Sequence, residues 1–129
     1  MSGPFVYVGT WVLKEDKAKE GRKHLAEHCA VVEANEPRLI AFHMYLGEDG
    51  RTASVVQVHP DSASMEFHMK LLTEHLRSSF EYIDHIISEQ YFGEASPELR
   101  ETLSAWDSPD VVTTWRPVHE AGFTRTTIR

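Results

Sequence analysis

The order of strand-like and helical segments constrains the fold of this chain more than any other feature of its sequence. Four segments rich in aromatic and β-branched residues alternate with two longer segments in which apolar residues recur every three or four positions. The order is strand, helix, strand, strand, helix, strand. It predicts a ferredoxin-like β-α-β-β-α-β fold of the α+β class, with two helices on one face of an antiparallel four-stranded sheet.

The spacing of apolar residues and the positions of turn residues predict where the strands and helices begin and end. Pro37 ends the first helical pattern, because the residue before a proline avoids helical geometry. Gly47 to Gly50 form a turn that makes the second and third strands a hairpin. The expected strands and helices are Phe5 to Leu13, Glu15 to Asn35, Leu39 to Leu46, Thr52 to His59, Ser62 to Asp84 and His85 to Phe92. The alternative for His85 to Phe92 is a continuation of the preceding helix.

The chain of 129 residues has the usual size of a single domain. Residues 5–93 are expected to form the ferredoxin-like domain, and residues 94–129 a C-terminal extension of the same structural unit. The extension contains a short helix that begins at Ser96-Pro97 and an extended segment from Val111 to Val118. Pro117 favours an edge strand, or an arm that adds to a partner.

Composition excludes several classes of protein. Hydrophobic residues make up 41% and charged residues 26%, as in ordinary globular domains. The net charge of -7 and the scattered 13 basic residues argue against nucleic-acid binding. No apolar run approaches the roughly 20 residues that span a bilayer, and no signal peptide is recognised at the start. With Cys29 as the single cysteine, we expect a cytoplasmic protein without a disulfide.

The predicted arrangement leaves one face of the sheet without helices. An apolar sheet face of this size is rarely left in water, so we expect two chains to pack face to face as a homodimer. The residues assigned to this face are Tyr7, Trp11, Leu39, Ala41, Tyr45, Ala53 and Val55.

Eight histidines are an unusual number for this length, and several fall near one another in the predicted fold. His43 and Tyr45 lie on the second strand, Gln57 and His59 on the third, and His68 at one edge of the apolar stripe of the second helix. Around a mostly apolar cavity, such groups suit a small aromatic or quinone-like ligand, with histidine as proton acceptor or hydrogen-bond donor. The alternative is that each is a half-buried histidine with a structural hydrogen bond.

Other candidate motifs carry less weight. His24 and His28 belong to an H-x-x-E-H pattern that could clamp zinc, but no third ligand is evident, so no metal site is expected. Cys29 sits among core positions without a clear general base. No glycine-rich nucleotide-binding motif and no serine-hydrolase motif occurs, and flavin or nicotinamide use has no support.

Three stretches carry a resemblance to a known family: Glu36-Pro37-Arg38-Leu39, Pro60 to His68, and Tyr91-Phe92-Gly93. Over about residues 5–93 the sequence resembles the antibiotic biosynthesis monooxygenase-like domains of the dimeric α/β-barrel superfamily. His68 matches the histidine that faces the cavity of that family.

The resemblance implies a dimeric α/β barrel and an oxygenase that uses no cofactor. Well-known members oxidise polycyclic phenols or quinols with dioxygen, and the substrate acts as its own reductant. The resemblance makes His68 the catalytic candidate. The candidates for substrate binding are His43, Tyr45, Gln57, His59, Tyr7 and Trp11. Strand one has no asparagine, and the Asn-Trp-His set of the haem-degrading branch is not found.

Two other functions remain open from the sequence. One is a non-catalytic ligand-binding or stress-response protein of the same fold. The other is an assembly module whose cavity is filled by its own side chains.

Overall fold

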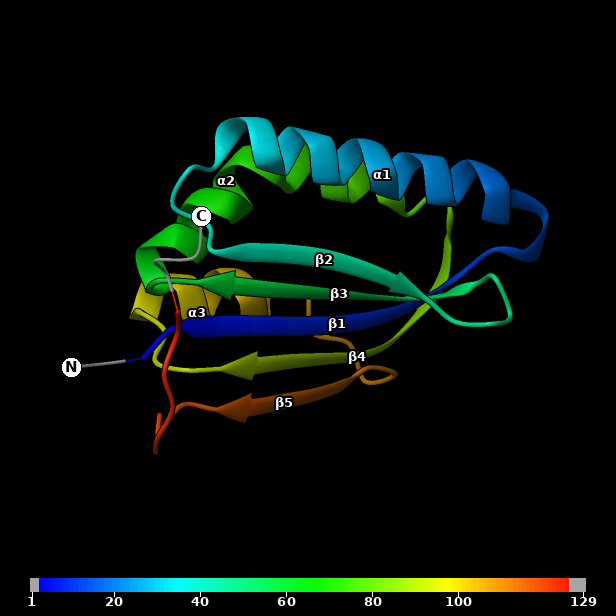
Figure 1. The fold of residues 1–129 in the computed structure, drawn as a ribbon. Helices are drawn as coiled ribbons and strands as arrows, with labels where there is room; N and C mark the ends of the chain where they lie inside the picture. Colours follow the sequence, from blue (N-terminus) through cyan, green and yellow to red (C-terminus); the bar gives the residue numbers. More distant parts are fainter. Residues whose placement is uncertain (1–2, 126–129) are drawn as a thin grey trace.

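The computed structural model describes residues 3–125 and contains one sheet with helices on one side (Figure 1). The strand order is β2-β3-β1-β4-β5. The strands are β1 Phe5–Leu13, β2 Ala41–Leu46, β3 Thr52–His59, β4 Ile83–Phe92 and β5 Val112–Arg116. The helices are α1 Ala18–Asn35, which follows the short 3-10 helix η1 Glu15–Lys17, α2 Ser62–Ser79 and α3 Pro97–Ser104.

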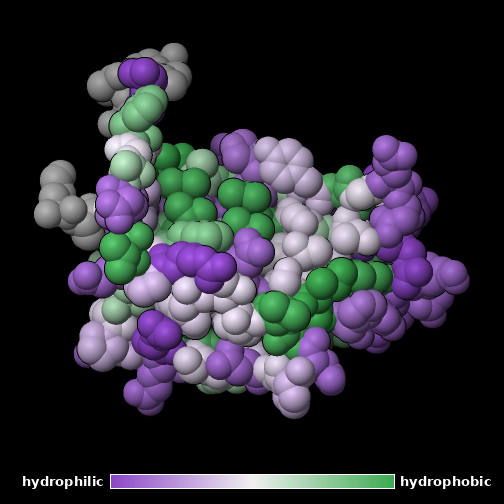
Figure 2. All heavy atoms as spheres, turned by 90° about the horizontal axis from the view of Figure 1, so that it is seen from below, coloured by the Kyte–Doolittle hydropathy of each residue, from purple (hydrophilic) through white to green (hydrophobic). Residues whose placement is uncertain are grey.

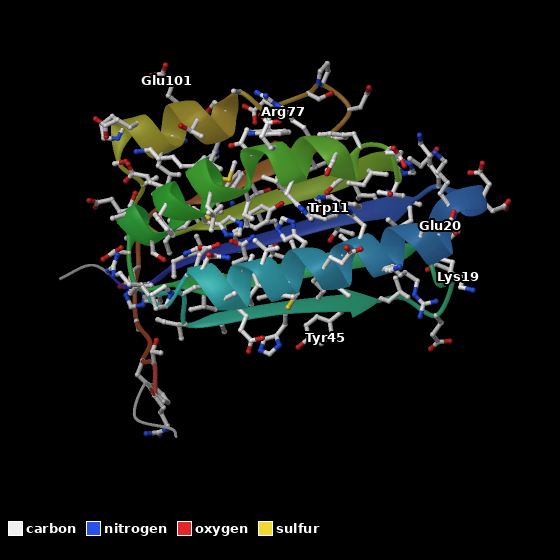
Figure 3. The ribbon with its side chains drawn as sticks, turned by 90° about the horizontal axis from the view of Figure 1, so that it is seen from above. Trp11, Lys19, Glu20, Tyr45, Arg77 and Glu101 are labelled. Atoms are coloured by element: carbon white, nitrogen blue, oxygen red, sulfur yellow. The ribbon has the colours of Figure 1, made fainter. Side chains whose placement is uncertain are left out.

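The predicted ferredoxin-like α+β fold is confirmed. β1 pairs antiparallel with β3 and β4, and β2 pairs antiparallel with β3. The C-terminal part adds β5, which runs parallel to β4, and α3, which packs beside α2 (Figures 1 and 3). Among residues 3–125, no helix combines the length and apolar character needed to cross a bilayer.

Local hydrogen bonds set where the helices begin and end. The Asp61 carboxylate accepts from the Ser64 backbone N–H at 3.0 Å and caps α2. The prediction that this helix reaches Asp84 is wrong, because it ends at Ser79. A turn closed by the bond from Tyr82 N–H to the Ser79 carbonyl follows, and Ile83 already pairs with Leu13 of β1. Strand pairing therefore overrides the helical pattern in this stretch.

Gly93 ends β4 in a backbone conformation that favours glycine. Its φ is 107°, and a Cβ at this position would lie 2.7 Å from the Pro4 carbonyl oxygen. Its N–H donates to the Arg116 carbonyl at 2.9 Å. A glycine here lets the ends of β1, β4 and β5 approach one another closely.

The face assignment of two strands differs from the prediction. Tyr7 and Trp11 are buried beneath the helices, as are Ala53 and Val55, so placing these four side chains on the open face is wrong. For β3 the reason is the register of the hairpin with β2. Leu46 pairs with Ala53 and Met44 with Val55, so Ala53 and Val55 lie on the face of Met44, beneath the helices. A change of one residue in register moves every side chain of a strand to the other face.

The open face of the sheet carries the side chains that alternate with this buried set. Val8 of β1 pairs with Val56 of β3, and Val6 pairs with both Val58 and Phe92. Figure 2 shows this face from below, with green hydrophobic patches interrupted by polar residues. In the single chain this apolar surface is uncovered.

Candidate functional site

A cavity of about 70 Å³ lies between the sheet and the helices. One ordered water needs roughly 10–15 Å³ of such space, so the cavity has room for a small molecule. Phe42, Met44, Val55, Met65 and Met69 form part of an apolar lining. The side chains with polar groups in the lining include Tyr7, His28, Gln57, His68, Glu89 and Tyr91.

His68 of α2 and Glu36 form a buried pair at the edge of the cavity. Nδ1 of His68 donates to Oε2 of Glu36 at 2.7 Å, and the side chains are 1% and 2% exposed. Glu36 directly follows α1, where Pro37 prevents another helical turn. Within residues 3–125, Nε2 of His68 has no hydrogen-bond partner. His68 therefore offers the cavity a nitrogen that can accept a proton, while the carboxylate holds the ring.

Gln57 is oriented by a buried hydrogen-bonded chain behind it. Nε2 of His59 contacts Oε1 of Gln57 at 2.9 Å, and Nδ1 of His59 contacts Oγ of Ser64 at 2.7 Å. Burial lowers the pKa of His59 to about 3, so its ring is neutral near pH 7. Because Oε1 can only accept, Nε2 carries the proton and the Ser64 hydroxyl donates to Nδ1. The amide NH₂ of Gln57 is left as a donor for the cavity.

Glu89 of β4 contributes a carboxyl group that sequence reasoning missed. Nε1–H of Trp11 donates to its Oε1 at 3.4 Å. Burial raises the pKa of Glu89 to about 7, and the neighbouring donors Tyr7 and Trp11 offset part of this rise. The signal for this residue was the alternation of strand four, which places Glu89 on the same face as Tyr91.

The C-terminal extension forms part of the cavity wall. Leu103 of α3 and Trp106 line the cavity. Trp115 of β5 stacks on Tyr91 with ring centroids 4.4 Å apart, and Arg100 lies 3.9 Å above the Trp115 ring centroid. These contacts tie α3 and β5 to the β4 wall of the cavity.

The histidines of the H-x-x-E-H pattern pack against α2. His24 stacks on His75 at 4.2 Å between centroids, and His28 lies 4.6 Å from the same ring. Burial lowers the pKa of His28 to about 3, and the positive forms of the neighbouring histidines lower it further. Glu27 is exposed. No cluster of three or more potential metal ligands occurs within residues 3–125.

Comparison with solved structures shows which proteins share this fold. MupZ from Pseudomonas fluorescens has a TM-score of 0.74 at 14% identity, over 100% of this chain and 94% of MupZ. A candidate antibiotic biosynthesis monooxygenase from Caulobacter crescentus has a TM-score of 0.63 at 17% identity, over 70% and 88% of the two chains. A similarly named protein from Chloroflexus aurantiacus has a TM-score of 0.59 at 9% identity, over 69% and 90%.

The chain has the fold of the antibiotic biosynthesis monooxygenase-like proteins. This fold is what the sequence resemblance implied. Neither a comparison with protein-family models nor one with curated protein sequences gives a match. The similarity at these low identities concerns the fold, and the chemistry has to be argued from the side chains.

The monooxygenase-like fold brings together four of the seven candidate residues from the sequence. Tyr7, Trp11, Gln57 and His68 line the cavity, and Trp11 lies on β1 beneath the space between α1 and α2 (Figure 3). His59 is fully buried behind Gln57, outside the lining.

The other two candidates, His43 and Tyr45, lie outside the cavity. They alternate with Phe42 and Met44 along β2, and it is Phe42 and Met44 that face the helices. The prediction that His43 and Tyr45 share a face with Gln57 is therefore wrong. Tyr45 is 61% exposed at the outer edge of the sheet (Figure 3).

Gly9 leaves the space in which the Tyr7 side chain lies. A Cβ on Gly9 would overlap the Tyr7 hydroxyl, lie 2.7 Å from its Cζ, and stand 3.3 Å from Oε2 of Glu89. We expect Gly9→Ala to displace Tyr7 and to lower the free energy of unfolding by about 1–3 kcal/mol, the usual cost of overpacking. Urea unfolding measures this effect, with Ser88→Ala on the open face as control. An unchanged midpoint for Gly9→Ala would contradict the packing described.

Proposed function

We propose that this protein is a cofactor-independent, monooxygenase-like enzyme that acts on a small aromatic substrate of the phenol or quinol type. The observation that carries the proposal is the His68–Glu36 pair beside an apolar cavity, with Nε2 of His68 free. A carboxylate behind the imidazole fixes the orientation of the ring and keeps the proton on Nδ1, which leaves Nε2 as the acceptor. Aromatic and methionine side chains around it suit a flat, apolar ligand.

In the proposed reaction, Nε2 of His68 accepts the phenolic proton. The resulting phenolate is electron-rich and reacts with dioxygen at a ring carbon. One oxygen atom becomes the new carbonyl of a quinone, the other leaves as water, and the substrate supplies all four electrons. The Gln57 amide donates a hydrogen bond to a substrate oxygen. General-base catalysis of this kind contributes about 10²–10⁴ in rate.

Oxygen consumption with a panel of hydroquinone, 1-naphthol and 2-naphthol tests this function. We expect turnover of at least one of them, with one atom of ¹⁸O₂ in the product. His68→Gln is expected to reduce kcat by about 10²–10⁴, because the amide cannot accept the proton. His85→Gln is the matched control, since His85 is exposed on β4.

Two outcomes would change the assignment. Full turnover in a folded His68→Gln variant would remove the proposed role of His68. Tight binding of the same phenols by the wild type without oxygen uptake would instead indicate a small-ligand-binding protein of the same fold.

We also propose that two copies pack through the open face to form a homodimer. The support is the apolar surface around Val8 and Val56, of a kind that is rarely left in water. Val56→Lys is expected to convert the dimer to a monomer in analytical ultracentrifugation. Leu71→Lys is the control, because Leu71 is an exposed leucine on α2. A monomeric wild type would contradict the proposal.

A further inference from the structure

The β4 wall of the cavity holds an ionisable group that the base chemistry of His68 does not use. Glu89 lines the cavity, and no salt bridge to it exists among residues 3–125. The neighbours on its own and adjoining strands are Tyr7, Trp11 and Tyr91, none of which is a cation near pH 7. A carboxyl group that is removed from water without a cation favours its neutral form.

Glu89 and the His68–Gln57 side lie on opposite walls. Gln57 is on β3 and Glu89 is on β4, with β1 between them. Two strand spacings separate β3 from β4, which corresponds to roughly 10 Å. His68 lies above the β2–β3 side, where its ring centroid is 6.0 Å from that of Phe42. A ring-sized ligand between these walls has a base on one side and a carboxyl group on the other.

The groups around Glu89 favour an acid at this wall. Trp11 donates to Oε1, and the Tyr7 hydroxyl lies beside Oε2 in the space above Gly9. The charge of Asp107, after α3, further disfavours ionisation of Glu89 and so raises its pKa. Arg100 of α3 lies over the Trp115 ring. His68, on α2, faces the cavity from the other wall.

We propose that Glu89 works as a neutral carboxylic acid that donates a hydrogen bond, and then its proton, to an oxyanion of the ligand at the β4 wall. This deepens the proposed function and rests on it for the identity of the ligand. It assigns the acid that complements the base His68, a division of roles that two differently placed titratable groups can sustain.

The proton transfers balance over one turnover. His68 takes the phenolic proton, and dioxygen adds to the ring to give a peroxide anion. Glu89 protonates that anion, and its O–H bond is replaced by an O–H bond on the peroxide. The Glu89 carboxylate then removes the proton of the oxygenated ring carbon while the O–O bond breaks, giving a quinone and hydroxide. Protonated His68 neutralises the hydroxide to water, and both residues return to their starting forms.

Binding of 2,4-dinitrophenol tests this role without oxygen chemistry. The compound is a phenolate throughout pH 6 to 8.5 and is too electron-poor to be oxygenated, so a pH dependence of Kd in this range comes from the protein. We expect Kd of the wild type to rise at least tenfold between pH 6.5 and 8.5, because ionised Glu89 cannot donate and repels the anion. Glu89→Gln retains a donor without a titration, so its Kd is expected to stay within about twofold.

Glu94→Gln is the matched control, since Glu94 is exposed just after β4, and it is expected to follow the wild type. A Glu89→Gln variant that keeps the tenfold rise would overturn the proposal, as would a wild type that does not bind dinitrophenolate at all. The expected binding pattern together with no oxygenation of any phenol would leave the Glu89 assignment standing and remove the oxygenase function.

Discussion

Replacement of Glu36 by alanine is expected to lower the free energy of unfolding by about 1–3 kcal/mol, the usual result of leaving a buried donor without its hydrogen-bond partner. Glu36 is only 5% exposed and is the sole partner of Nδ1 of His68 within residues 3–125. Without it, a buried N–H loses its acceptor and a cavity replaces the carboxylate. Urea unfolding at pH 7.5 measures the change as a lower midpoint.

Glu33→Ala is the control for this experiment, because Glu33 lies exposed on α1, one turn before Glu36. We expect it to change the stability by less than about 0.5 kcal/mol. Glu36→Gln retains an acceptor for Nδ1 and is expected to lose less stability than Glu36→Ala. If Glu36→Ala unfolded at the wild-type midpoint, the pair would contribute neither to stability nor to the orientation of His68.

Acidification is expected to destabilise the protein through its buried neutral histidines. Burial lowers the pKa of both His28 and His59 from 6.5 to about 3. Between these values the unfolded chain binds protons that the folded chain does not, so the stability falls as the pH falls. At pH 5 each histidine costs about 2 kcal/mol, and the pair about 4 kcal/mol.

Glu89 opposes this acid effect. Its pKa rises on folding from 4.5 to about 7, so the folded chain binds the extra proton between these values and the stability rises as the pH falls. From pH 7.5 to 5 this contributes about 2 kcal/mol. The wild type should therefore lose about 2 kcal/mol over this interval, and Glu89→Gln about 4 kcal/mol.

Denaturant unfolding at pH 7.5 and 5 measures both values, and Glu94→Gln serves again as the control. At pH 7.5 we expect Glu89→Gln to be more stable than the wild type, because the buried negative charge is gone. Equal acid sensitivity of Glu89→Gln and the wild type would show that Glu89 does not titrate between these pH values.

The position of His68 in the cavity was accessible from the sequence because it depends on helical periodicity. His68 and Met65 are three residues apart on one stripe of α2, and both line the cavity. The same argument failed for His43, whose face depends on how β2 is registered against β3. Alternation within a strand shows which residues share a face, but not which face meets the helices.

The contacts of Glu36 with His68 and of Glu89 with Trp11 could not be predicted from the sequence, for a different reason. Glu36 and His68 are 32 residues apart, and their contact depends on how the end of α1 sits beside α2. Glu89 and Trp11 are 78 residues apart and meet because β1 and β4 pair. A pattern among neighbouring residues does not show which residues so far apart in the chain come into contact.

The sequence by itself determined the number and order of the strands and helices, because hydrophobic periodicity, proline and turn residues act over a few neighbouring positions. It also indicated His68 through its place on an amphipathic helix. The tertiary structure alone decided the faces of β2 and β3, the buried pair of His68 with Glu36, and the place of Glu89 beside Trp11 in the cavity wall. These features arise from strand register and from burial, and both are set by contacts between residues far apart in the chain.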